Sequence, residues 1–152
     1  MKITRLMLVG LAAVLLTACD PGFDEEYIID NQSSHNLVFV WSGQWHYYPY
    51  ENGRNFDGTY PVPAGQQVSL PYNGGLGGTS RDAIRYTARY YLLGDSVSFV
   101  VGADTLTFYA SDTLGADSPY NFDSPRYTYD ELPGNGWASL TFRVDDAMLM
   151  SR

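Results

Sequence analysis

The chain has 152 residues, with 17 acidic against nine basic side chains and a formal net charge of −8. This length suits one domain with a core of its own. The acidic balance argues against nucleic acid and against adhesion to anionic lipid through charge, because both need clustered basic side chains. A single cysteine excludes a disulfide framework, so the core alone must stabilise the fold.

The first 18 residues have the pattern of a secretory signal. Lys2 and Arg5 precede an apolar stretch from Leu6 to Ala18, which matches the charged and hydrophobic regions of such a signal. The stretch is too short to span a bilayer, which takes about 18 or more apolar residues. We therefore expect residues 1–18 to be a signal peptide.

Cys19 ends the run Leu16-Thr17-Ala18-Cys19, which is typical of the lipobox of a bacterial lipoprotein. The thiol of such a cysteine becomes a thioether to a diacylglycerol, and the freed amino group can take a further acyl chain. Since each buried methylene contributes about 0.8 kcal/mol, several chains hold a protein stably at a membrane. The pattern predicts lipidation at Cys19 and an outer-membrane location, on the surface or periplasmic face. A general secretory signal with a coincidental cysteine is the alternative.

Residues 19–26 form the expected tether between lipid and fold. Asp20-Pro21-Gly22 and the acids from Asp24 to Glu26 make this segment acidic and turn-prone. Loss of the signal leaves seven arginines and no lysine against seventeen acids, a net charge of −10. We expect a lipidated acidic tether over 19–26 and a single β-rich domain over 27–152.

Alternating apolar and polar residues predict several strands. Residues 27–30 are expected to pair with Leu37 to Trp41 across a turn at residues 31–34. Leu37 to Trp41 is apolar on both faces, which suits a central strand. The two prolines and the glycine of Pro61-Val62-Pro63-Ala64-Gly65 predict a tight turn leading into a strand over residues 67–70.

The segment from Thr79 to Leu93 fits two structures. As a helix it would be capped by Thr79 and ended by Gly94, yet its apolar residues also alternate as in a strand; we favour the short helix. A hairpin is expected from residues 97–101 and 105–109, and a strand over residues 139–144. Together these elements predict a mainly β fold, an antiparallel β-sandwich or open barrel with at most one or two short helices.

An aromatic group follows the early strands in a stretch rich in Gly, Asn and Pro. Flat rings on a loop can stack on the apolar faces of sugars, and their polar tips can hydrogen-bond hydroxyls. The pattern indicates either a glycan platform or a secondary core under a long loop. The candidate ligand-binding residues are Trp41, Trp45, Tyr47, Tyr48 and Tyr50.

Three other segments have both a functional and an ordinary interpretation. Residues 112–123 offer oxygen ligands for calcium but do not match an EF-hand, so turn capping is favoured. Residues 74–78 lack the lysine of a P-loop and indicate a flexible loop. Arg81, Arg85 and Arg89 would form one stripe on a helix, most simply paired with acids of the same domain.

Little in the chain points to catalysis. His35 and His46 are the only histidines, and no nucleophile elbow or zinc-ligand pair accompanies them. A Ser-His-Asp arrangement would depend on geometry alone. We predict no enzyme, no catalytic residue, no metal and no cofactor.

Three short segments carry a family resemblance. They are Ser118-Pro119-Tyr120-Asn121-Phe122-Asp123-Ser124, Gly74-Gly75-Leu76-Gly77-Gly78 and Asp95-Ser96-Val97. With the lipobox, they make most of the mature chain resemble a group of small uncharacterised lipoproteins from Bacteroidetes-type bacteria. In that group, acidic residues soon after the lipidated cysteine act as a surface-export signal. Here three consecutive acids begin only at Asp24, five positions after Cys19, which departs from that pattern. The resemblance implies surface display but no reaction.

We therefore expect a lipid-anchored envelope protein that works as a non-catalytic binding or surface-assembly module. Its partners would be the membrane, through the lipid on Cys19, and a glycan or an envelope protein, but no nucleic acid. A glycan-binding surface lipoprotein or, further off, a hydrolase is the alternative.

Overall fold

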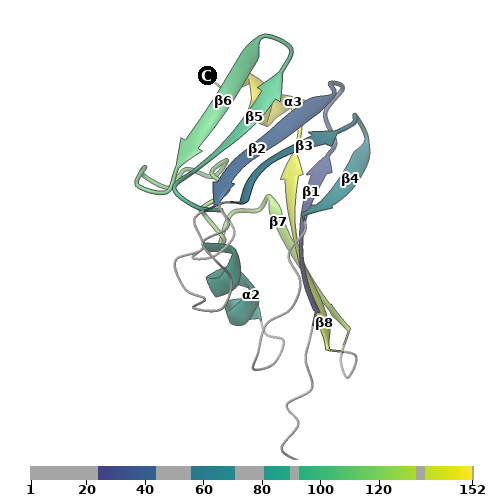
Figure 1. Ribbon diagram of the computed structural model, residues 1–152, viewed down its shortest axis with the longest axis vertical. Coiled ribbons are helices and arrows are strands. Elements are labelled where there is room, and N and C mark those ends of the chain that lie inside the picture. Colours follow the sequence, from purple (N-terminus) through teal and green to yellow (C-terminus); the bar gives the residue numbers. More distant parts are fainter. Residues whose placement is uncertain (1–23, 44–55, 71–80, 90–92, 133–135, 152) are drawn as a thin grey trace, which may run out of the picture.

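The computed structural model describes residues 24–43, 56–70, 81–89, 93–132 and 136–151. These contain two four-stranded sheets and two short helices (Figure 1). One sheet has the order β4-β1-β8-β7, formed by Gln66–Leu70, Asp24–Asn31, Trp137–Val144 and Tyr127–Leu132. The other has the order β3-β2-β5-β6, formed by Phe56–Val62, Leu37–Gly43, Ser96–Val101 and Asp104–Tyr109. The helices are α2, Arg81–Thr87, and α3, Asp146–Met150.

The two sheets share one core, which confirms the predicted mainly β sandwich with two short helices. All strand pairs are antiparallel except β1 with β8, which run side by side in the same direction. The described part of the chain holds no helix that is both long and apolar enough for a membrane crossing.

The predicted pairing of residues 27–30 with β2 is wrong. β1 pairs with β4 and β8, whereas β2 lies in the opposite sheet between β3 and β5. The cause is Asn31, which is fully buried and whose Nδ2 donates to the carbonyls of His35 and Val62, both at 2.8 Å. Its Oδ1 accepts from the backbone N–H of Ser33 at 3.1 Å. The turn is therefore an arch that carries the chain from one sheet to the other.

β1 begins at Asp24, three residues before the expected domain boundary. The acids that we assigned to the tether are therefore part of the strand, in parallel register with Trp137, Ala138 and Ser139 of β8. Four residues, 20–23, separate Cys19 from the fold.

The turn predicted at Pro61 to Gly65 is confirmed. β3 ends at Val62, Gly65 has a φ of 71°, and β4 begins at Gln66. A positive φ is easily adopted by glycine, which has no Cβ. β3 itself was not predicted; it lies at the edge of its sheet, where Pro61 costs no ladder hydrogen bond on its free side.

The predicted β5–β6 hairpin is also confirmed. The helical interpretation of Thr79 to Leu93 is confirmed over Arg81–Thr87, whereas the predicted cap at Thr79 lies outside the described residues. Gly102, with a φ of 60°, makes the hairpin turn, and Ser98 and Thr107 share a cross-strand hydrogen bond of 2.8 Å. α2 buries Ile84 and contacts β8.

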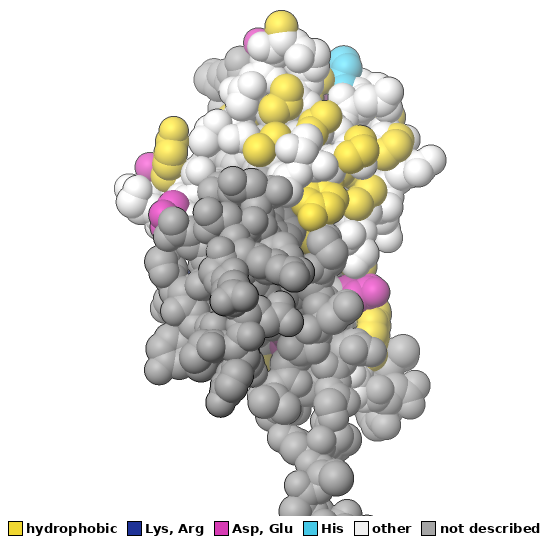
Figure 2. Space-filling model, viewed as in Figure 1, with side chains coloured by type: hydrophobic (Ala, Val, Ile, Leu, Met, Phe, Trp, Pro, Cys, Tyr) yellow, Lys and Arg dark blue, Asp and Glu magenta, His cyan; other side chains and the backbone are white. Residues whose placement is uncertain are grey.

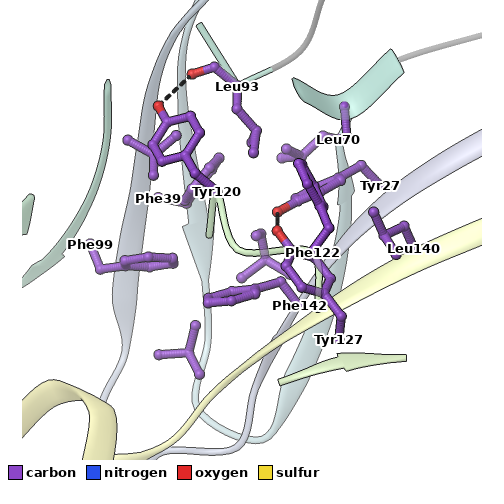
Figure 3. Close-up of a cluster of buried hydrophobic side chains, with 14 of the residues drawn as sticks. Tyr27, Phe39, Leu70, Leu93, Phe99, Tyr120, Phe122, Tyr127, Leu140 and Phe142 are labelled. Carbon is purple, nitrogen blue, oxygen red and sulfur yellow. Dashed lines mark hydrogen bonds between the residues drawn. The ribbon is translucent and has the colours of Figure 1, made fainter. Parts of the chain in front are cut away.

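Aromatic rings fill the space between the sheets (Figure 3). Phe99 of β5 stacks on Phe142 of β8 with ring centroids 6.0 Å apart, and Phe142 meets Tyr127 at 4.9 Å. The hydroxyls of Tyr27 and Tyr127 lie 2.5 Å apart, and that of Tyr127 also donates to the carbonyl of Pro119. Burial raises the pKa of both tyrosines, so they remain neutral hydrogen-bonding groups of the core.

The loop between β6 and β7 contributes to this core. Tyr120 and Phe122 are buried, and the Tyr120 hydroxyl donates to the carbonyl of Leu93 at 3.1 Å. The acidic, turn-rich segment between β6 and β7 thus supplies two aromatic side chains to the core.

Candidate functional site

Most of the sequence-predicted site residues lie outside the described residues. These are Cys19, Trp45, Tyr47, Tyr48 and Tyr50, together with His46. The backbone of Trp41 is described; it lies in β2 opposite Gly58 of β3 and Val97 of β5. Lipidation at Cys19 and glycan stacking on the aromatic group remain predictions.

The described residues form a pocket at one end of the sandwich, which we call the tip. β1 and β8 both run toward this end, where β1 leads into the arch and β8 leads into α3 (Figure 1). Asp24 at the start of β1 therefore lies at the other end. Seven residue steps at about 3.3 Å each separate Asp24 from Asn31 by about 23 Å.

α3 is held at the tip by its first residues. The Asp145 side chain caps the helix by accepting from the Met148 backbone N–H at 2.9 Å. Met148 is fully buried and packs into the core. Sequence reasoning missed this helix, although an Asp in the capping position was a usable signal.

Asp146 ties α3 to the arch. Its Oδ1 accepts from the backbone N–H of Ser34 at 3.0 Å and from the Ser34 hydroxyl at 3.2 Å. The arch is itself fixed by the hydrogen bonds of buried Asn31. The arch and the start of α3 therefore hold defined positions at the tip.

The tip pocket has a volume of about 300 Å³. Its apolar part combines a buried ring from β5 with half-buried side chains from β5, β6 and α3, and its polar part combines one histidine with two carboxylates. The lining residues are His35, Phe99, Val101, Asp104, Leu106, Asp146, Leu149 and Met150. Its described lining therefore offers apolar contact together with one imidazole and two carboxylates.

A second hollow lies on the outer face of the β3-β2-β5-β6 sheet. Figure 2 shows apolar side chains gathered over the upper part of the molecule, where β2, β3 and β5 lie. A groove of about 290 Å³ there is lined by Asn36, Leu37, Val38, Pro61, Val62, Pro63, Val100 and Gly102. The described residues of this lining carry no charged side chain, so they do not indicate what kind of ligand the groove would bind.

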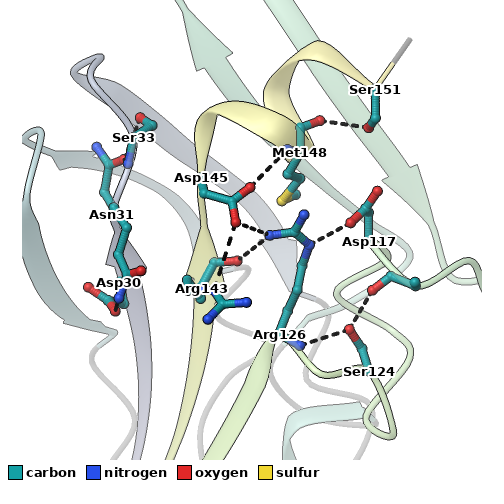
Figure 4. A network of polar contacts seen from close by, with 12 residues as sticks. Asp30, Asn31, Ser33, Asp117, Ser124, Arg126, Arg143, Asp145, Met148 and Ser151 are labelled. Carbon is teal, nitrogen blue, oxygen red and sulfur yellow. Dashed lines mark hydrogen bonds and ion pairs between the residues drawn. The ribbon is translucent and has the colours of Figure 1, made fainter.

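A network of ion pairs joins the β6–β7 loop to the end of β8 and the start of α3 (Figure 4). The Arg126 side chain is 10% exposed and binds Asp117 at 2.5 Å and Asp145 at 3.0 Å. Arg143 is more exposed, at 44%, and lies 3.9 Å from the same Asp145 carboxylate. Burial alone would raise the pKa of Asp145, but hydrogen bonds from Arg126 and the Met148 N–H outweigh it and hold that pKa below its ordinary value.

The acids of residues 112–123, for which the sequence favours turn capping over calcium binding, have partners within the protein. Asp117 binds Arg126, and Asp123 lies 3.2 Å from Arg85, whose guanidinium also donates to the Phe122 carbonyl at 2.5 Å. Asn121 instead fixes turns, accepting from the backbone N–H of Asp123 at 3.2 Å. Within the described ranges, no three His, Cys, Asp or Glu side chains converge as a metal site would require. Arg85 thus takes the intramolecular role that the sequence favoured for the basic stripe.

Glu25 is a buried carboxyl at the other end of the sandwich. It is 2% exposed, and its Oε2 atom has no hydrogen-bond partner among the residues that the structure describes. Burial raises the pKa of Glu25, and a hydrogen bond with the Thr87 side chain of α2 offsets this only in part. The ionised form is therefore unfavourable in the folded state.

This burial makes stability depend on pH. Because the folded state holds the Glu25 proton more tightly than the unfolded chain does, the free energy of unfolding falls as pH rises through the raised pKa. We expect Glu25→Gln to raise the free energy of unfolding at pH 8 by about 1 kcal/mol, and to raise it less at pH 4. Urea denaturation at both pH values measures the difference.

Glu26→Gln serves as the control, since Glu26 is the next residue in β1 and points to the opposite face. A gain from Glu25→Gln that is equal at pH 4 and pH 8 would contradict this account of Glu25.

No protein-family model, curated protein sequence or solved structure matches this chain.

Proposed function

We propose that this protein is a lipid-anchored lipoprotein of the outer membrane whose β-sandwich acts as a non-catalytic binding module. The anchoring is inferred from the lipobox Leu16-Thr17-Ala18-Cys19, which ends a stretch with the pattern of a secretory signal. The chain's resemblance to small lipoproteins of Bacteroidetes-type bacteria points the same way.

The geometry of the domain supports this proposal. The linker from Cys19 to Asp24 spans at most about 17 Å when fully extended, so an anchored Cys19 would hold the start of β1 near the bilayer. The tip pocket, formed at the opposite end, would then be directed away from the lipid and open to solutes.

The same geometry bears on surface display. With Asp24, Glu25 and Glu26 paired in β1, Asp20 is the one acid left between Cys19 and the fold. A surface-export signal confined to the segment before β1 would therefore lack these three acids. We therefore propose the periplasmic face on equal terms with the cell surface.

The described lining of the tip pocket supports binding, because it combines an apolar wall with polar and charged side chains. The partner would be a solute, a glycan or an envelope protein. A glycan site on Trp45 and its neighbouring tyrosines remains a prediction from the sequence.

Metabolic labelling with an alkyne fatty acid tests the anchoring. We expect the wild-type protein to carry the label and to sediment with outer membranes, because Cys19 is acylated. Cys19→Ala should lose both the label and the membrane association. Label retained on Cys19→Ala, or a wild-type protein that stays unlabelled and soluble, would overturn the proposal.

A further inference from the structure

We propose that the tip pocket binds a small amphipathic cation, an organic amine with an apolar body of about ten non-hydrogen atoms. This inference rests on the proposed binding function and names the ligand class. It follows from three properties of the pocket: its size, its apolar lining and the sign of its charge.

The size sets the upper limit of the ligand. The volume of about 300 Å³ suits a small molecule. It also lies at the small end of the range for ligand pockets, about 300–1,000 Å³. A single ring with a short side chain fits this space, whereas an oligosaccharide or a peptide would extend beyond it.

The lining selects an apolar body. Phe99 and Leu106 are paired across β5 and β6, so they form one continuous wall. Leu149 of α3 forms a further part of the lining, and Phe99 is itself held by its stack on Phe142. Because these side chains are fixed by the core, a ring that enters meets a preformed surface and little ordering of the protein is needed.

The charge selects a cation. Among the described residues of the lining, Asp146 offers the pocket a carboxylate. The two hydrogen bonds from Ser34 reach Oδ1 of Asp146, so they orient the carboxylate. An ammonium group beside Asp146 would make a charge-assisted hydrogen bond, which is about twice as strong as a neutral one. An anionic ligand would meet like charge.

Methionine methyl groups report directly on this site. The chain has four methionines, of which Met1 and Met7 lie in the predicted signal and Met148 and Met150 in α3. Met150 lines the pocket and is 74% exposed, whereas Met148 is fully buried and reports on the fold. A bound aromatic ring shifts a methyl resonance next to it.

We would titrate the full mature protein, labelled with ¹³C-methyl methionine in nanodiscs of zwitterionic lipid, with three compounds of one shape. These are 2-phenylethylamine, 2-phenylethanol and phenylacetate, which differ mainly in charge. We expect the amine to shift the Met150 signal with an affinity about tenfold higher than the alcohol. Phenylacetate should leave the signal in place.

Asp146→Asn isolates the charge, because the amide oxygen can still accept both hydrogen bonds from Ser34. We expect it to lower the affinity for the amine about tenfold and to leave that for the alcohol unchanged. Asp130→Asn, an exposed acid on β7, serves as the matched control and should change neither. An unshifted Met148 signal shows that each variant is folded.

Equal affinity for amine and alcohol, or tighter binding of phenylacetate, would overturn the ligand class and leave a binding module in place. If none of the three compounds shifts Met150, the tip pocket is not the binding site. Neither outcome bears on anchoring, which the fatty-acid label on Cys19 tests separately.

Discussion

Phe142→Ala is expected to lower the free energy of unfolding by about 4 kcal/mol, the largest effect of any single change described here. Phe142 is fully buried and lies between Phe99 of the opposite sheet, at 6.0 Å, and Tyr127 of its own sheet, at 4.9 Å. Truncation removes the ring that joins the two sheets and leaves a cavity that they cannot fill. Guanidinium denaturation followed by circular dichroism measures the loss.

Thr141→Ala is the matched control for this change. Thr141 is the preceding residue of β8, points to the other face and is only half-buried. We expect a loss under about 1 kcal/mol. If both variants lost the same amount, Phe142 would not hold the central place in the core that we assign to it.

Arg126→Ala is expected to lower the free energy of unfolding by about 2 kcal/mol, because the guanidinium joins the β6–β7 loop to the end of β8 through three contacts. It binds Asp117 of the β6–β7 loop at 2.5 Å, Asp145 at 3.0 Å and the carbonyl of Arg143 at 3.4 Å. Breaking a fully buried pair costs about 3–5 kcal/mol. The carboxylates here are 36% and 31% exposed, so water compensates part of the loss. Thermal unfolding at neutral pH measures the effect.

Arg143→Ala provides the comparison, since Arg143 meets the same Asp145 carboxylate at 3.9 Å while 44% exposed. Pairs of this kind contribute about 0.2–1 kcal/mol, so we expect a loss under about 1 kcal/mol. The Asp145 contribution is present above its unfolded pKa and is lost as pH falls through the lowered pKa. The difference between the two arginine variants should therefore shrink in acid. A difference that persists unchanged at low pH would contradict the network.

Local patterns in the sequence predicted several elements correctly. The strict alternation of Leu140, Phe142 and Val144 marks β8, and the glycine at 102 marks the β5–β6 turn. The ambiguous segment forms α2, where Ile84 is buried. In these elements the local preference and the tertiary packing agree.

Predictions from local sequence patterns were wrong or incomplete where long-range contacts determine the structure. Asn31 belongs to a cluster that is typical of a hairpin turn, yet burial of its amide against Val62 makes the segment an arch. β3 was hidden by Gly58 and Pro61, which are tolerated because that strand lies at an edge. Tyr120 and Phe122 lie in an acidic, turn-rich loop, and no periodicity there signals that they reach the core.

The tip pocket was not predictable for a related reason. Its lining comes from the arch, from β5 and β6, and from α3, which are far apart in the sequence. In the sequence, each lining residue also fits an ordinary structural role in its own strand, turn or helix. His35, for example, reads as a turn residue until the arch brings it toward α3. Cys19 is the opposite case, because a lipobox is a contiguous motif and needs no fold to be recognised.

The most direct test of the central claim is the intact mass of the protein purified from the membranes of its expressing cells. If Cys19 anchors the domain, the chain begins at Cys19 and its mass exceeds that of residues 19–152 by a diacylglyceryl group and one further acyl chain. An unmodified mass, or a chain that begins at any other residue, would contradict the account.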